Sequence, residues 1–183
     1  MTNYDRFKYP SVSDVYSHYC KPSYAGMSLE EIIKLEEKHS YIRSHCVAVA
    51  MDMWTTDTND EYKLYIESFR KWQQENIKEV IATQILLFDD VNRFTGRIDI
   101  ICTLKNDELV AITIKTSKKS KSWELQLSAY KNLCYTNRYD VKRNIILQLS
   151  KKGEIATEFE CDDIDKSWSI FNNILNGWHY FKS

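Results

Sequence analysis

The chain has 183 residues, an apolar content of 43% and a formal net charge of −1 at pH 7. This length predicts a single domain over residues 1–183 with a core of its own, and the apolar content excludes a disordered chain. A net charge near zero excludes a protein that is basic all over, such as a general nucleic-acid coat, but it is compatible with a local basic patch.

The first 76 residues predict helices. Residues 11–14 have capping character and predict a short helix over about 13–20. Ser28 and Glu31 form a capping box that begins a long helical region, which should reach about Trp54 with a break near His39. A second capping box at 58–61 precedes a helix whose apolar residues recur at spacings of three and four.

Residues 78–160 predict the core of a sheet. We expect a strand over 80–88, a hairpin over 95–115 that turns at 105–108, a helix over about 122–137, and strands over 145–149 and 155–159. Residues 162–182 predict a last helix. The order predicts an α/β fold with a mixed central sheet flanked by helices and with helical additions at the N-terminus.

The hairpin carries the chemistry of the chain. Because side chains alternate across a strand, we expect Asp99 to point to the face opposite Ile98 and Ile100. Thr113 and Lys115 share a face of the second strand, so pairing of the two strands places them beside Asp99. A carboxylate and an ammonium that converge at strand ends are typical of a site that handles phosphate.

A lysine-rich loop follows the hairpin. Together with Lys115, three further lysines place four positive charges in seven residues, and these three are candidates for binding nucleic acid: Lys118, Lys119 and Lys121.

The rest of the sequence gives no sign of a membrane or of a metal cluster. The first ten residues do not resemble a signal peptide, and no apolar stretch approaches the roughly 20 residues that span a bilayer. We therefore expect an intracellular, cytoplasmic protein without a membrane partner. The five cysteines are widely spaced and contain no C-x-x-C pair, which predicts reduced thiols and no iron–sulfur cluster.

Three short motifs stand in order along the second half of the chain: GRID at 96–99, ITIKT at 112–116 and QLSAY at 126–130. They resemble the glycine-x-x-aspartate, the acidic-x-lysine strand and the glutamine-x-x-x-tyrosine helix of the PD-(D/E)XK nuclease superfamily, particularly its RecB-like and phage exonuclease branch. The likeness covers about residues 78–160. More weakly, YPSVS at 9–13 is similar to the proline-serine-valine-threonine segment of such proteins.

This resemblance implies a restriction-endonuclease-like core in which two or three carboxylates hold Mg²⁺ or Mn²⁺ and the metal activates a water. It implies that Asp99 is a metal ligand and that Lys115 orients the water or neutralises the charge on the phosphate. Gln126 and Tyr130 would contact the substrate strand or brace the site.

The sequence departs from the family pattern at its acidic positions. Thr113 stands where an acidic ligand is expected, and Gln84 stands where the preceding strand often has a glutamate. The arginine-glycine-x-x-x-histidine helix pattern falls on 43–48, where His45 precedes the expected histidine position, Ala48, by three residues. Neutral donors beside the single carboxylate of Asp99 should bind Mg²⁺ poorly, so we expect catalysis to be absent or impaired.

Three functions are compatible with these patterns. The first is a nuclease-fold protein that binds DNA or RNA or docks on a nucleic-acid-processing complex. The second is an active, metal-dependent DNA exonuclease that uses Asp99, Lys115 and an unorthodox ligand such as His45 or Gln84. The third is a protein-interaction module or inhibitor built on the same fold.

Structural roles are the simpler interpretation of the same residues. Asp99 and Lys115 could form a salt bridge in a disused site, and Gln126 and Tyr130 could pack at the edge of the core. We expect His39 to be a surface or packing residue.

Overall fold

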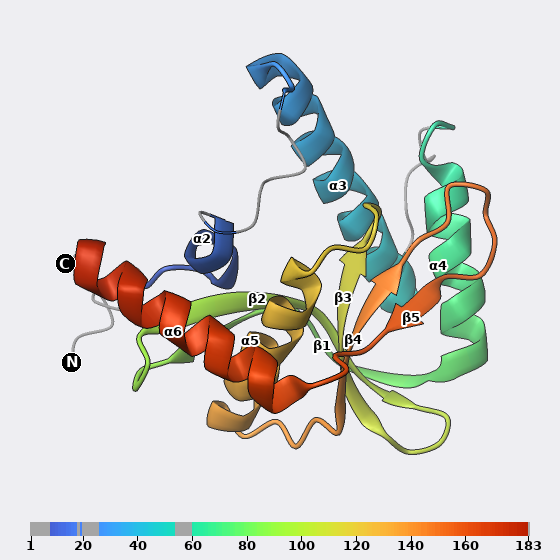
Figure 1. Ribbon diagram of the computed structural model, residues 1–183. Coiled ribbons are helices and arrows are strands. Elements are labelled where there is room, and N and C mark those ends of the chain that lie inside the picture. The colour runs from blue at the N-terminus through green and yellow to red at the C-terminus, as the bar shows by residue number, and fades with distance from the viewer. Residues whose placement is uncertain (1–7, 18, 20–25, 54–59, 183) are drawn as a thin grey trace.

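One mixed sheet forms the centre of the protein (Figure 1). The computed structural model describes residues 8–17, 19, 26–53 and 60–182. The strands lie in the order β1-β2-β3-β4-β5, and their bounds are Ile77–Asp89, Phe94–Leu104, Leu109–Lys115, Arg143–Gln148 and Thr157–Phe159. Only the β3–β4 pair is parallel; the other three pairs are antiparallel. The predicted α/β fold with a mixed sheet is confirmed.

Helices cover both faces of this sheet (Figure 1). They are α2 (Val12–Ser17), α3 (Leu29–Ala50), α4 (Lys63–Asn76), α5 (Ser122–Thr136) and α6 (Ile164–Lys182). Side chains of α3 and α4, such as Ile42 and Phe69, pack with one set of sheet residues. Side chains of α2, α5 and α6, such as Val12 and Leu133, pack with another set. The two faces of the sheet thus have separate hydrophobic cores.

The N-terminal helices differ from the prediction in their lengths. The capping box is present, with Ser28 Oγ accepting from the Glu31 amide and Glu31 Oε2 accepting from the Ser28 amide. The predicted break near His39 is wrong, because α3 continues to Ala50. Neither His39 nor Ser40 lacks a backbone donor, so nothing in the chain interrupts the helical hydrogen bonds there. The short helix α2 ends at Ser17; Cys20, Trp54 and Thr58, on which further predictions fell, lie outside the described residues.

An irregularity crosses β1 and β2 at the level of Asp99. The predicted alternation on β2 is wrong here: Ile98 packs on the side of α5, whereas Ile100 packs on the side of α3 and α4. On β1, Gln84 adopts a left-handed backbone with φ of 50°. It stands across from Asp99, because the neighbouring pairs are Thr83–Ile100 and Ile85–Ile98. Two strands therefore leave regular geometry at one point, as is common next to functional sites.

The hairpin of β2 and β3 opens toward the same point. Its two strands pair from Thr103–Leu109 to Ile100–Ile112 and then separate. The turn at 105–108 lies at the closed end, as predicted. The open end consequently leaves room for side chains between the two strands.

The described cysteines are free thiols, as predicted. Cys46, Cys102 and Cys134 are buried, and burial raises the pKa of Cys102 and of Cys134 to about 12. Of the helices that the structure describes, none combines the length and the apolar character needed to cross a membrane.

Candidate functional site

Asp99 fills the gap where β2 and β3 separate. Its side chain is 3% exposed, and Oδ2 accepts a hydrogen bond of 2.8 Å from the backbone amide of Ile114. The other oxygen, Oδ1, lies 3.4 Å from Nε of Arg43 on α3. Burial raises the pKa of Asp99, while the Arg43 charge and the Ile114 amide oppose that rise. One carboxylate oxygen thus accepts a backbone hydrogen bond, and the other lies beside the Arg43 cation.

Lys115 ends β3 beside this carboxylate. The predicted Asp99–Lys115 salt bridge is not formed: Asp99 pairs with Arg43, and within the described residues Lys115 has no ion pair. Burial lowers the pKa of Lys115, and Asp99 and Glu36 act in the opposite direction. Lys115 is therefore a partly buried cation whose charge is incompletely compensated.

Helix α3 contributes a row of polar side chains, of which the sequence interpretation had placed only Arg43 in a motif. Glu36, His39 and Arg43 recur at spacings of three and four, and all three act electrostatically on the Lys115 region. His39 is partly buried and faces the charges of Arg43 and Lys115, which, after burial itself, help to lower its pKa. The signal was present in the sequence as this helical spacing from Arg43.

Gln126 and Tyr130 lie on the buried face of α5. Nε2 of Gln126 donates a hydrogen bond of 3.0 Å to the Tyr130 hydroxyl. Burial raises the pKa of Tyr130 well above its ordinary value, and the nearby Asp99 charge adds to the rise. The predicted i, i+4 pair is formed, and electrostatic proximity links it to Asp99.

Gly96 explains how the first and third motifs fit together. A Cβ at this position would lie 2.7 Å from Cε1 of Tyr130 and 2.7 Å from Cδ1 of Leu133, closer than carbon atoms can approach. The glycine of the GRID motif thus allows the Tyr130 ring to press against β2. Its φ lies outside the left-handed region, so space rather than backbone conformation requires it.

Several buried polar side-chain atoms have no hydrogen-bond partner among the described residues. Three belong to residues near the motifs, namely Nε2 of Gln84, Oε1 of Gln126 and Oγ1 of Thr116, and one is Oδ1 of Asn144. Nε of Arg43 also makes no hydrogen bond, but it forms the ion pair with Asp99. Buried polar atoms are almost always paired in folded proteins, with water or a ligand where the protein offers nothing. Their concentration on residues of the motifs indicates a polar site with binding capacity left over.

The predicted neutral ligands lie in different places. Thr113 is buried and immediately precedes Ile114, the amide donor to Asp99. His45 is directed elsewhere: its Nδ1 is 2.9 Å from the carbonyl oxygen of Tyr41, and its ring stacks on the Tyr41 ring at 4.0 Å. Residues two positions apart in a helix point in directions that differ by about 200°, so Arg43 and His45 cannot both face Asp99.

The residues at Asp99 do not fit Mg²⁺ or Mn²⁺. In the described part of the chain no group of three or more His, Cys, Asp or Glu side chains is close enough to hold an ion. Mg²⁺ requires oxygen ligands in octahedral geometry and usually one or two carboxylates. Here the carboxylate of Asp99 is already paired with the Arg43 cation, which a divalent ion would have to displace.

No family model matches this chain, and the comparison with curated proteins returned no match.

The lysine-rich loop borders the site between β3 and α5. Lys118, Lys119 and Lys121 are exposed, and Nζ of Lys119 lies 5.1 Å from the centre of the Phe159 ring. These positive charges stand next to Lys115 in sequence and at the same open end of the hairpin. The predicted basic patch is thus exposed where an anion approaching Lys115 would meet it.

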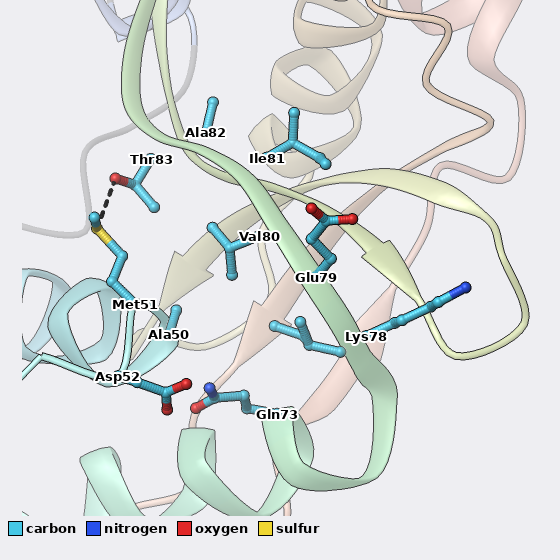
Figure 2. A pocket seen from close by; sticks show the side chains of 11 residues that line it. Ala50, Met51, Asp52, Gln73, Lys78, Glu79, Val80, Ile81, Ala82 and Thr83 are labelled. Atoms are coloured by element: carbon cyan, nitrogen blue, oxygen red, sulfur yellow. Dashed lines mark hydrogen bonds between the residues drawn. The ribbon is translucent and has the colours of Figure 1, made fainter.

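A shallow hollow of about 450 Å³ lies elsewhere, between the end of α3, α4 and the start of β1 (Figure 2). Asp52 and Gln73 line one end, and the Lys78 side chain points away from them (Figure 2). None of the motif residues lines this hollow. This depression is therefore separate from the residues that meet at Asp99.

Proposed function

We propose that this chain is a nucleic-acid-binding protein with a nuclease-like core and without metal-dependent hydrolysis of its own. The observation that carries the proposal is the Arg43–Asp99 ion pair, 3.4 Å between Nε and Oδ1. A guanidinium neutralises the only carboxylate of the three motifs, at the point where the family resemblance would place a metal.

The charges around this pair favour an anionic partner. Lys115 is partly buried and incompletely compensated, and Lys118, Lys119 and Lys121 extend the positive charge to the surface. Nucleic-acid backbones are bound by such lysines, since each phosphate contact releases a condensed counterion. The buried amide oxygen of Gln126, which has no hydrogen-bond partner among the described residues, supplies hydrogen-bonding capacity in the same region.

The resemblance to the PD-(D/E)XK superfamily supports the proposal on the level of residues. Gly96, Asp99, Lys115, Gln126 and Tyr130 converge, with Gly96 against Tyr130 and Asp99 near Lys115. Thr113 in the acidic position agrees with the loss of metal binding. A scaffold that retains the cationic and amide groups while lacking the ligands suits binding better than cleavage.

Fluorescence anisotropy with labelled single- and double-stranded DNA and RNA tests the proposal. We expect binding that weakens by about tenfold or more between about 50 and 200 mM salt. The triple variant Lys118→Glu, Lys119→Glu, Lys121→Glu should lose binding. A control variant changes the net charge by the same amount at exposed positions outside the loop: Lys105→Glu, Lys131→Glu, Lys166→Glu. This control should retain most of the binding. Absence of binding at low salt would overturn the proposal.

Cleavage assays distinguish the alternatives. Labelled linear DNA with Mg²⁺ or Mn²⁺ should remain intact in the presence of the wild type. Cleavage that disappears in Asp99→Ala would instead establish the exonuclease. A stable protein partner together with no affinity for any nucleic acid would establish the interaction module.

A further inference from the structure

A second, strongly basic cavity lies at the opposite end of β2 from the hairpin turn. It has a volume of about 400 Å³ and is formed by Lys8, the β1–β2 turn and the last turns of α6. Four of its lining side chains carry basic nitrogen, and none of the described lining residues is acidic. They are Lys8, Arg93, His179 and Lys182.

Among the residues that the structure describes, no carboxylate forms an ion pair with the lysines or the arginine of this cavity. Within the described residues, Lys8, Arg93 and Lys182 form no ion pair, whereas Arg143 at another edge of the sheet pairs with three glutamates. Like charges gathered around a concave surface raise the local potential and attract anions. The cavity therefore favours an anionic group, and Arg93 can offer a planar, bidentate donor to phosphate.

The turn that carries Arg93 is held in one conformation before any ligand arrives. Asp89 is 1% exposed and accepts hydrogen bonds from the amides of Val91 and Asn92, each of 2.9 Å. Its Oδ2 also accepts from the side-chain amide of Asn132 on α5, at 2.6 Å. Arg93 itself has φ of 58°, a conformation that non-glycine residues adopt at a cost.

Helix α6 is tied to the same turn. Nε2 of His179 lies 3.0 Å from the carbonyl oxygen of Asn92, which fixes the two walls of the cavity relative to each other. Trp178 lines the cavity and is partly buried, and its ring meets that of His179 edge-on at 5.4 Å between centroids. A held indole provides a flat surface on which a nucleobase can stack.

We propose that this cavity binds a phosphorylated nucleoside unit. Arg93, Lys8 and Lys182 hold the phosphate, and Trp178 stacks against the base. The unit can come from a free nucleotide or from a nucleic-acid strand. Only the assignment to a strand rests on the function proposed above, since the cavity shares no residue with the Asp99 site.

Nuclear magnetic resonance of the indole N–H groups tests this directly, with the Trp178 signal assigned through Trp178→Phe. The probes are deoxythymidine monophosphate, a 5′-phosphorylated oligothymidylate of about ten nucleotides, and inorganic phosphate. We expect the Trp178 signal to shift with a nucleotide probe at concentrations at which phosphate alone has no effect. A response to the monophosphate indicates a free nucleotide as ligand, and a response to the oligonucleotide alone indicates a strand.

Charge variants separate this site from the first. Arg93→Glu with Lys182→Glu should weaken the response about tenfold or more, whereas the matched pair Lys105→Glu with Lys166→Glu should leave it unchanged. In the triple variant of Lys118, Lys119 and Lys121 the monophosphate response should persist, whatever happens to strand binding. No Trp178 shift with either nucleotide, or an equal response to inorganic phosphate, would overturn the proposal.

Discussion

The guanidinium of Arg43 lies against the carboxylate of Asp99 and thereby joins α3 to the sheet where β2 and β3 separate. This pair connects α3, which packs on one face of the sheet, to the strand β2. Since Asp99 also receives the Ile114 amide, one side chain connects α3, β2 and β3. The pair thus has a structural role that does not depend on catalysis.

Removing the carboxylate should destabilise the fold. Asp99→Ala leaves the Ile114 amide without its acceptor and Arg43 without its anion, so we expect the free energy of unfolding to fall by about 2 kcal/mol. Asp99→Asn keeps an acceptor for Ile114 and should lose less, about 1 kcal/mol. Urea denaturation measures both values. A double-mutant cycle with Arg43→Met gives the coupling energy of the pair, and a coupling of zero would contradict the structural role.

Lys115 should cost stability at neutral pH. Its pKa in the folded state lies below the ordinary value of 10.5, so the unfolded chain binds more protons between these two values and stability rises with pH in that window. Lys115→Met should therefore stabilise the protein by about 1 kcal/mol at about pH 7, and the gain should shrink as the pH approaches about 10.

Thermal unfolding of the wild type and of Lys115→Met at both pH values measures whether the stability gain shrinks as the pH rises. Lys118→Met, which changes an exposed lysine of the adjoining loop, serves as the control and should show no such dependence. A gain from Lys115→Met that grows with pH would contradict the prediction. The same variant should bind nucleic acid more weakly than the wild type, because one phosphate contact is lost.

Gly96→Ala should destabilise the protein by about 2–3 kcal/mol, because the new methyl overlaps Tyr130 and Leu133. Gly177 in α6 is the matched control: a Cβ there would meet only the Tyr19 hydroxyl at 3.7 Å. Gly177→Ala should stabilise by about 0.5–1 kcal/mol through helix propensity. Chemical denaturation measures the free energy of unfolding of both variants. Equal changes in the two would contradict the steric requirement for glycine at position 96.

A carboxylate at Thr113 should create affinity for Mn²⁺. Thr113 precedes the amide donor to Asp99, so we expect the carboxylate of Thr113→Glu to lie near that of Asp99. We expect measurable Mn²⁺ binding by calorimetry in Thr113→Glu with Arg43→Met, in which the competing cation is also removed. The wild type and Arg43→Met alone are the references. If the double variant binds no better than these, Thr113 does not occupy the ligand position.

The sequence predicted the features of the fold that depend only on residues close together in the chain. The capping box of Ser28, the hairpin turn and the order of strands and helices followed from local patterns. The alternation on β2 failed at Asp99, because the carboxylate takes an amide from β3 and the strands separate there. An expectation that side chains alternate along a strand assumes an unbroken ladder of backbone hydrogen bonds. It cannot anticipate that a side-chain carboxylate accepts one of the backbone amides.

The candidate site was predicted in part for the same reason. Asp99, Lys115, Gln126 and Tyr130 could be named from short motifs, whereas the contribution of Glu36 and His39 depends on how α3 crosses the sheet. Arg43 was assigned to a motif but not to a partner. Tertiary packing decided that the partner of Asp99 is an arginine more than fifty positions away in sequence rather than the lysine on the neighbouring strand.

The contact between Gly96 and the Tyr130 ring bears on how relatives of such a chain can be recognised. The Tyr130 ring leaves no room for a Cβ at position 96, so a sequence signature built on this pair reports the shape of a scaffold. The residue at 113, by contrast, stands at the position where the resemblance places an acidic ligand, so it would report the chemistry. Binders and hydrolases of one architecture would share the first signature and be told apart by the second.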